Sequence, residues 1–267
     1  MNADSRVGEA PYVTRQDRAG VVTLTLNRGD RFNALSVPMI AAIQAALDAI
    51  RDDAAARVVV LAAAGRGFCA GHDMKEMRSH AGDAVWQKGL FDACARMMLT
   101  LTEIPQPVIA RVHGIATAAG CQLVSMCDLA VASSDARFAL PGLNIGVFCS
   151  TPAVGVARNV LRKQAMEMLL TGEMIDAPTA LARGLVNRVV APAELDAAIE
   201  KLTGQICARS AAVIAAGKRV FYRQVEAPIA DAYALAGEAM TCNLGLADAN
   251  EGMDAFLEKR APNWKHR

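Results

Sequence analysis

Two segments of this 267-residue chain repeat one pattern, in which a short apolar run leads into a loop of small residues and then a helix. In the first segment, an apolar run at residues 58–61 precedes a glycine-rich loop at residues 64–73. In the second, an apolar run at residues 108–112 precedes a helix expected at residues 118–127, whose first turn carries little side-chain bulk. Such units form parallel sheets and place their loops at the carboxyl ends of the strands. The pattern predicts an α/β protein in which both loops line one crevice.

The rest of the chain is predicted to contain a hairpin, several short strands and a long run of helices. A polar stretch at residues 176–192 separates the strands from the last helices. We therefore divide the chain into a core of residues 1–192, with residues 1–11 expected to be disordered, and a C-terminal helical oligomerisation region of residues 193–267. The further expected elements are strands at 12–16, 21–26, 129–133, 137–140 and 186–190 and helices at 37–51, 194–209, 210–222, 229–246 and 250–259.

Composition excludes several classes of partner. The chain is 53% hydrophobic with a formal net charge of +1, so it lacks the basic surface that nucleic acids and anionic membranes attract. No apolar run is long enough to span a bilayer, and Asp4 and Glu9 precede any apolar segment, so we expect a soluble, cytoplasmic protein. Seven cysteines without paired spacing and four dispersed histidines match no metal-site pattern, so no metal is expected.

The start of the helix at residues 118–127 has two interpretations. The first amides of a helix lack intrahelical acceptors and lie at the positive end of the helix dipole, so a ligand oxygen there meets ready donors. Alternatively, Ala118, Ala119 and Gly120 are small only because the helix packs closely against its neighbours. These residues alone leave both interpretations open.

Five motifs follow one another along the chain: Asn27-Arg28 with Asn33-Ala34-Leu35, and then residues 67–77, 107–128, 180–186 and 251–260. Together they resemble the crotonase, or enoyl-CoA hydratase/isomerase, superfamily, and the likeness extends from about Tyr12 to the end of the chain. The resemblance implies a crotonase-like α/β fold, with a core of repeated ββα units and a C-terminal helical trimerisation region. It also implies a homotrimer or a dimer of trimers.

The resemblance further implies an acyl-CoA thioester as ligand, with coenzyme A as part of the substrate and no separate cofactor. In the family two backbone N–H groups hold the thioester oxygen, and the matching residues here are His72 and Ala119. The His72 imidazole then needs no catalytic role, and lining the pocket is favoured over proton transfer because the sequence shows no carboxylate partner. The positions at which the family contacts coenzyme A are Asn33, Ala34, Ala70, Asp73, Met74, Lys75, Gly120 and Lys259.

The departures from the family concern its acid–base groups. Hydratases of the family carry two glutamates, and Gln122 and Gly142 hold those positions here. An amide cannot take a proton from water and glycine has no side chain, so ordinary hydration loses a contribution of roughly 10² to 10⁴ in rate. Relatives that isomerise or dehalogenate place an aspartate at the position of Ser150, although an N-cap role is the simpler interpretation of this serine. A nucleophilic Cys149 is disfavoured because no basic residue neighbours it in sequence.

Three functions are compatible with these residues. The first is an acyl-CoA enzyme that stabilises a thioester enolate and moves the proton by a noncanonical group. The second is a catalytically silent acyl-CoA-binding protein, and the third is a classical hydratase with weak activity. The loss of both glutamates resembles a subgroup, the enoyl-CoA-hydratase-domain-containing proteins. Outside the family, a serine hydrolase lacks its Gly-x-Ser-x-Gly motif here and a dinucleotide-dependent dehydrogenase lacks Gly-x-Gly-x-x-Gly.

Overall fold

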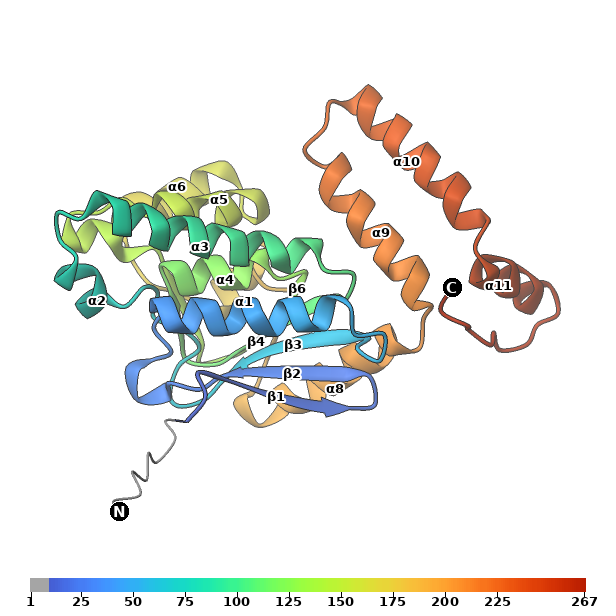
Figure 1. Ribbon diagram of the computed structural model, residues 1–267, viewed down its shortest axis with the longest axis horizontal. Coiled ribbons are helices and arrows are strands. Elements are labelled where there is room, and N and C mark those ends of the chain that lie inside the picture. Colours follow the sequence, from blue (N-terminus) through green and yellow to red (C-terminus); the bar gives the residue numbers. More distant parts are fainter. Residues whose placement is uncertain (1–9) are drawn as a thin grey trace, which may run out of the picture.

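A six-stranded sheet forms the centre of the protein in the computed structural model, which describes residues 10–267 (Figure 1). Its strand order is β1-β2-β3-β4-β6-β9, and only the β1–β2 hairpin is antiparallel. The expected disorder at residues 1–11 falls mainly outside the described residues, but Pro11 is held in place, because Asn27 Nδ2 donates to its carbonyl at 3.0 Å. The strands are β1 (Val13–Arg18), β2 (Val21–Leu26), β3 (Val58–Ala63), β4 (Val108–Val112), β6 (Leu129–Ser133) and β9 (Arg188–Val190).

The middle strand β3 is buried along its whole length because helices cover both faces of the sheet. Val59 and Leu61 join the main hydrophobic core with residues of α1 and α3. The alternate residues Val58 and Val60 meet α8 (Leu195–Cys207) on the other face. Because α8 completes the packing of the sheet, the body of the protein continues through α8, past the boundary predicted at residue 192.

A small second sheet, of order β5-β7-β8, holds the glycine-rich loop against the start of α4. Phe68 N donates to Ile115 O at 2.9 Å, and Thr117 N donates to Cys69 O at 2.9 Å. Two of these strands were not predicted, because segments of two or three residues are too short to show an alternating pattern. The strands are β5 (Ile115–Thr117), β7 (Arg137–Ala139) and β8 (Ile175–Asp176).

Helices surround the two sheets. The helix predicted at residues 37–51 is confirmed as α1, and Ser36 caps it by accepting a hydrogen bond from Met39 N at 3.4 Å. The helix predicted at residues 118–127 is confirmed as α4 with slightly shorter ends. The helices are α1 (Val37–Arg51), α2 (Met74–Ser79), α3 (Ala84–Glu103), α4 (Ala119–Met126), α5 (Ser150–Asn159), α6 (Arg162–Thr171), α7 (Ala177–Ala182), α8, α9 (Ala211–Gln224), α10 (Ile229–Leu244) and α11 (Ala247–Leu257), with 3-10 turns η1 (Gly29–Arg31), η2 (Pro141–Ile145) and η3 (Pro192–Glu194).

A buried polar cluster anchors α9 to the body. Lys218 Nζ donates to Asp128 Oδ2 at 2.6 Å and to two backbone carbonyls, and Tyr222 donates to Asp128 Oδ1 at 2.9 Å. Asp128 Oδ2 also accepts from Val108 N at 2.6 Å, which ties the cluster to β4. Burial lowers the pKa of Lys218, while the neighbouring Asp128 opposes that shift. The aspartate at the end of the 107–128 motif therefore has a structural role.

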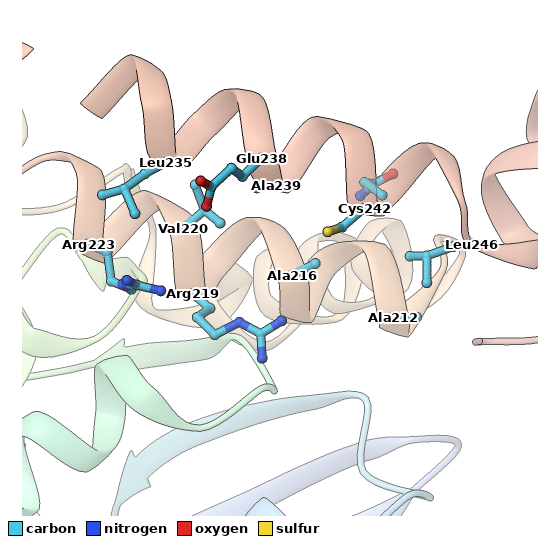
Figure 2. A pocket seen from close by; sticks show the side chains of 11 residues that line it. Ala212, Ala216, Arg219, Val220, Arg223, Leu235, Glu238, Ala239, Cys242 and Leu246 are labelled. Atoms are coloured by element: carbon cyan, nitrogen blue, oxygen red, sulfur yellow. The ribbon is translucent and has the colours of Figure 1, made fainter. Parts of the chain in front are cut away.

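Beyond this anchor, α9, α10 and α11 form an arm that stands away from the body of the protein (Figure 1). Figure 2 shows Val220, Leu235 and Cys242 between α9 and α10, where a cavity of about 410 Å³ opens. No residue of α10 is buried, and Tyr233 is 76% exposed. Phe256 on α11 is 82% exposed. The arm thus carries apolar side chains that the chain itself does not cover. No helix within residues 10–267 is both long and apolar enough to cross a bilayer.

Candidate functional site

A cavity of about 640 Å³ opens between the glycine-rich loop, the start of α4 and the segment that joins η2 to α5. The two loops that were predicted to line one crevice do so, since Ala70 and His72 come from the first loop and Ala118 and Ala119 from the second. Sequence analysis did not identify most of the remaining walls, although Phe91 belongs to a helix whose buried residues recur at helical spacing. The apolar walls are formed by Met74, Met77, Phe91, Ile145, Val147 and Phe148.

The backbone N–H groups of His72 and Ala119 have no acceptor. Within residues 10–267 neither group donates a hydrogen bond, and both residues line the cavity. Ala119 begins α4, and Ala118 before it adopts φ 49° and ψ −120°, a conformation that residues with side chains rarely adopt. Ala118 N donates to Ala139 O at 2.9 Å, so β7 holds this turn in place. Two backbone donors without an acceptor among residues 10–267 therefore belong to residues that line the same cavity.

Two glycines bring these segments into contact. Gly71 has φ +96°, and a Cβ added there would lie 2.9 Å from Ala118 Cβ and 3.3 Å from Ala119 N. A Cβ added at Gly120 would lie 2.0 Å from Cys69 O. Gly120 is therefore small because the backbones pack closely, which was the second interpretation of this helix start. The free N–H of Ala119 agrees with the first interpretation, in which the helix start offers donors to a ligand. Each interpretation therefore applies to one of two adjacent residues.

The His72 side chain lines the cavity beside Phe91. The two rings meet edge to face, with centroids 5.4 Å apart and planes at 90°. Burial lowers the pKa of His72 to about 4, so the imidazole is neutral at neutral pH. Its buried Nε2 has no hydrogen-bond partner within the described residues. Among residues 10–267, no carboxylate forms a hydrogen bond or ion pair with this ring to orient it for proton transfer.

Gln122 lies on the same face of α4 as Ala118 and Ala119, because residues three and four apart are neighbours on a helix. Gln122 is only 5% exposed, and its Oε1 has no partner among residues 10–267. The predicted site position is therefore occupied by a buried neutral amide, which can donate and accept hydrogen bonds but cannot carry a proton away.

Gly142 lies on the opposite side of the cavity in η2. Its carbonyl accepts from Val147 N at 2.9 Å, which closes a tight loop. A Cβ added at Gly142 would lie 2.2 Å from Val147 O and 2.8 Å from Cys149 Sγ. The loop therefore has no room for any side chain at this position, and a glutamate would require the chain at residues 147–149 to move.

The remaining candidates near Gly142 are Cys149 and Ser150. Cys149 is buried, and desolvation raises the pKa of its thiol, which is unfavourable for a nucleophile. Ser150 is exposed, and its hydroxyl donates to Phe148 O at 3.4 Å. The predicted N-cap role of Ser150 is wrong, because Cys149 occupies the N-cap of α5 and no side chain caps that helix.

A second cavity, of about 470 Å³, lies on the other side of the glycine-rich loop. Ala34, Asp73 and Lys75 line it together with Arg31, whereas Ala70, His72 and Met74 line the first cavity. Asp73 also caps α2 by accepting from Lys75 N at 2.9 Å. Residues 70–75 thus present alternate side chains to two adjacent cavities.

The Asn33 side chain makes its hydrogen bonds to the protein backbone. Its side chain is fully buried, and Nδ2 donates to Ala64 O at 2.9 Å and to Gly67 O at 3.0 Å, while Oδ1 accepts from Arg28 N at 2.9 Å. The Asn33 side chain therefore has no free hydrogen-bonding group to offer to coenzyme A, and the predicted contact at this position stays a prediction for its backbone. This residue instead fastens the glycine-rich loop to the turn after β2.

Lys259 lies after α11 on the arm, with φ +57°, and lines neither cavity of this chain. Arg260 is paired with Glu251 and Glu258, with N–O distances of 2.6 Å to each, so it belongs to a surface charge cluster. Within residues 10–267, no group of histidine, cysteine, aspartate and glutamate side chains is placed to hold a metal ion.

Comparison with known proteins agrees with this geometry. The family model described as enoyl-CoA hydratase/isomerase matches residues 16–267. The chain belongs to the enoyl-CoA hydratase/isomerase family. Among its relatives, enoyl-CoA hydratase domain-containing protein 3, mitochondrial, of Xenopus laevis is 43% identical over 266 residues, which cover 100% of this chain and 90% of the relative. The Homo sapiens protein of the same name is 41% identical and covers 99% of this chain and 87% of the relative.

Solved structures of family members confirm the predicted crotonase-like fold. An enoyl-CoA hydratase of Mycobacterium smegmatis superposes with a TM-score of 0.93 at 55% identity, over 95% of this chain and 99% of that one. The human enoyl coenzyme A hydratase domain-containing protein 3 gives a TM-score of 0.92 at 41% identity, over 95% of this chain and 100% of that one.

The relatives contradict the prediction of a cytoplasmic protein. The enoyl-CoA hydratase domain-containing proteins of Xenopus laevis, Mus musculus and Homo sapiens are all named mitochondrial. The prediction was wrong because balanced charge and the lack of a long apolar run do not distinguish one aqueous compartment from another.

Proposed function

We propose that this family member binds an acyl-CoA thioester in the cavity between the glycine-rich loop and α4. The observation that carries the proposal is the pair of unused N–H groups of His72 and Ala119, two residues that line one cavity. Preorganised backbone donors of this kind stabilise negative charge on a thioester oxygen without rearrangement. The neighbouring Ala118 and Gly71, in their unusual conformations, keep the two donors in place.

The arrangement of the two cavities supports an elongated ligand. The acyl group occupies the apolar first cavity, and the nucleotide end of coenzyme A extends past residues 70–75 into the second. There Arg31 and Lys75 supply positive charge for phosphate groups. Three carboxylates, of Asp30, Asp73 and Glu76, line the same cavity. Asp73 caps α2, and Glu76 accepts a hydrogen bond from Val37 N at 2.9 Å, so both are engaged by backbone N–H groups.

The chemistry of the first cavity distinguishes this protein from an ordinary hydratase. None of the residues that line it within the described chain is an aspartate or glutamate, and the family glutamate positions hold Gln122 and Gly142. The N–H groups can stabilise a thioester enolate, but fast hydration also needs a group that takes and returns a proton. We therefore propose noncanonical or weak acid–base chemistry. A catalytically silent acyl-CoA-binding protein is the alternative, and the absence of a carboxylate in this cavity favours it.

A panel of acyl-CoA thioesters tests the proposal. The purified protein is incubated with saturated, enoyl, dienoyl and hydroxyacyl thioesters, binding is measured by calorimetry, and products are identified by mass spectrometry. We expect binding of thioesters and slow turnover of crotonyl-CoA. A product from any thioester supports an enzyme, and binding without any product supports the silent alternative. No binding of any thioester would overturn the proposal.

We further propose that the arm assembles the protein into a homotrimer or a dimer of trimers. The support is the exposed apolar surface of α10 and α11, which includes Ile229, Tyr233 and Phe256. Light scattering after gel filtration is expected to give three or six times the 28.2 kDa mass of the chain. A monomer mass would contradict this assembly.

A further inference from the structure

Helix α2 forms part of the wall of both cavities. Its residues Met74 and Met77 line the first cavity, which is the proposed acyl site, whereas Lys75 and Glu76 line the second cavity. The helix is only six residues long, and none of its residues is buried. A helix of this length is not stable on its own, so contacts with neighbouring elements must hold it in place. Those contacts therefore set the shape of the first cavity.

One hydrogen bond joins α2 directly to α1. Glu76 Oε2 accepts from the backbone N–H of Val37, the first residue of α1, at 2.9 Å. The end of α2 is held differently, because the His80 ring that follows it stacks on Trp86 of α3 with centroids 3.9 Å apart. Within residues 10–267, no other hydrogen bond connects a residue of α2 to α1 or α3. The Glu76 carboxylate is therefore the polar link between this wall and the helix beside it.

Helix α1 is a firm anchor for the Glu76 carboxylate. It is 15 residues long, and six of its residues are buried. Its first turn leaves the N–H of Val37 available, since the Ser36 side chain accepts from Met39 N. A carboxylate is favoured at this place because the start of a helix carries partial positive charge. Glu76 thus ties a short, exposed helix to a long, buried one.

We propose that Glu76 is a positioning residue, which fixes Met74 and Met77 as the wall of the acyl site through its hydrogen bond to Val37 N. The inference rests on the proposed function, because that function places the acyl group in the first cavity. Glu76 itself lines the second cavity, where its negative charge opposes the binding of phosphate groups. The same side chain therefore strengthens the binding of the acyl group and weakens the binding of the coenzyme A part.

The affinity ratio of two thioesters isolates the effect of Glu76 on the acyl wall. Dissociation constants of butyryl-CoA and hexanoyl-CoA are measured by calorimetry at neutral pH. The two ligands share the whole of coenzyme A and differ by two methylene groups, so a change in the second cavity cancels in their ratio. Burial of the two methylene groups against the wall is expected to make hexanoyl-CoA bind about 15-fold more tightly to the unmodified protein.

Two variants break the hydrogen bond from opposite ends. Glu76→Ala removes the acceptor, and Val37→Pro removes the donor while the charge of Glu76 remains. Proline suits this position because it is the first residue of α1 and the preceding Ser36 is extended, with φ −76° and ψ 164°. Each variant is expected to lower the affinity ratio to below about four-fold, since a loosened wall packs less well against the longer chain. Val37 lines neither cavity, so Val37→Pro changes no residue of the cavity walls.

Two further variants serve as matched controls. Glu76→Gln keeps an oxygen acceptor for Val37 N and removes the negative charge. Its affinity ratio is expected to equal that of the unmodified protein, while both thioesters bind more tightly because the second cavity is less negative. Val37→Ala shortens the side chain and keeps the N–H group, so it is expected to keep the full ratio.

The outcomes separate this inference from the proposed function. An unchanged ratio in a folded Val37→Pro protein would overturn the inference, because the hydrogen bond would then not position the wall. A fall in Glu76→Gln equal to that in Glu76→Ala would also overturn it, since the charge would then be responsible. If one of the two bond-breaking variants fails to fold, the other carries the test.

The unmodified protein provides two further outcomes. Equal affinity for butyryl-CoA and hexanoyl-CoA would show that the acyl chain does not contact α2, which would overturn the inference and leave acyl-CoA binding intact. If neither thioester binds, the proposed function fails and the inference fails with it.

Discussion

The two sides of the acyl cavity are built by different means. On one side, His72 and Ala119 present backbone N–H groups that are held by Gly71, the strained Ala118 and the small second sheet. On the other side, Gly142 and the buried Cys149 offer no acid or base. In the proposed function, thioester binding therefore uses mainly backbone groups, whereas a reaction would depend on side chains. One family fold can keep the first property while losing or changing the second.

The largest effect is expected from Gly120→Ala, which disturbs the side of the cavity that carries the backbone N–H groups of His72 and Ala119. The new methyl group would overlap Cys69 O, so the glycine-rich loop or α4 must move and the two N–H groups separate. Because small misplacements of binding groups are costly, thioester affinity is expected to fall about 100-fold. Calorimetric titration measures this effect.

Gly237→Ala is the control for Gly120→Ala. Gly237 lies on α10 with nothing within 4 Å of an added Cβ, so thioester affinity is expected to stay unchanged. If Gly120→Ala fails to fold, Gly71→Ala provides a second test of the same contact, because φ +96° disfavours a side chain there. Undiminished binding by a folded Gly120→Ala protein would show that the N–H groups are not the binding site.

The second side of the cavity is tested by Gly142→Ala. The added methyl group would lie 2.2 Å from Val147 O, and the resulting strain is expected to reduce the free energy of unfolding by about 1–3 kcal/mol. Urea denaturation measures the change. Gly89→Ala on α3, which has open space around an added Cβ, is expected to be neutral or slightly stabilising. A neutral effect of Gly142→Ala would show that this loop accommodates side chains.

A smaller effect is expected when both family glutamates are restored. The variant Gln122→Glu with Gly142→Glu supplies the two missing carboxyl groups, but the η2 loop has no room for the second one. The rate of crotonyl-CoA hydration is therefore expected to rise less than about ten-fold. Gln122→Glu alone is the comparison. A gain of about 100-fold or more from the double variant would mean that only the acid–base groups are missing.

A pH dependence of stability is also expected from His72. Its pKa is about 4 in the folded protein and about 6.5 in an exposed histidine, so protonation favours the unfolded chain. The stabilising contribution of the neutral ring is complete above pH 6.5 and is lost as the pH falls toward 4. Denaturant midpoints of the unmodified protein are expected to fall more steeply over this range than those of His72→Phe. Parallel curves would show that the ring is not buried.

Much of the body of the fold could be predicted from the sequence, because its signals are local. The buried run of β3 and the capped helix α1 have periodic patterns and ordinary ends. The pairing of β5 with β7 is different, because three-residue strands gain stability only from their tertiary setting. The sheet-covering role of α8 also escaped prediction, since an amphipathic helix does not indicate which surface it covers.

The candidate site was predicted in position but not in detail. The sequence named His72, Ala119 and Gln122, and the structure places His72 and Ala119 on the wall of one cavity, with Gln122 one turn further along α4. The side-chain hydrogen bonds of Asn33 were not predicted, because bonds to backbone carbonyls such as Ala64 O leave no trace in sequence. The sequence showed Gly142 only as a position that lacks the family's glutamate, whereas the structure shows a loop with no room for a side chain there. Contacts between distant segments decide both points.

The central claim, that two backbone N–H groups hold the thioester oxygen, is tested most directly by the infrared frequency of the bound thioester carbonyl. A thioester labelled with ¹³C at the carbonyl gives a band that can be isolated by subtracting the spectrum of the unlabelled complex. Two strong hydrogen bonds weaken the carbonyl bond, so the account predicts a band at lower frequency than that of the same thioester free in water. A tightly bound thioester whose carbonyl frequency equals or exceeds its value in water would contradict the account.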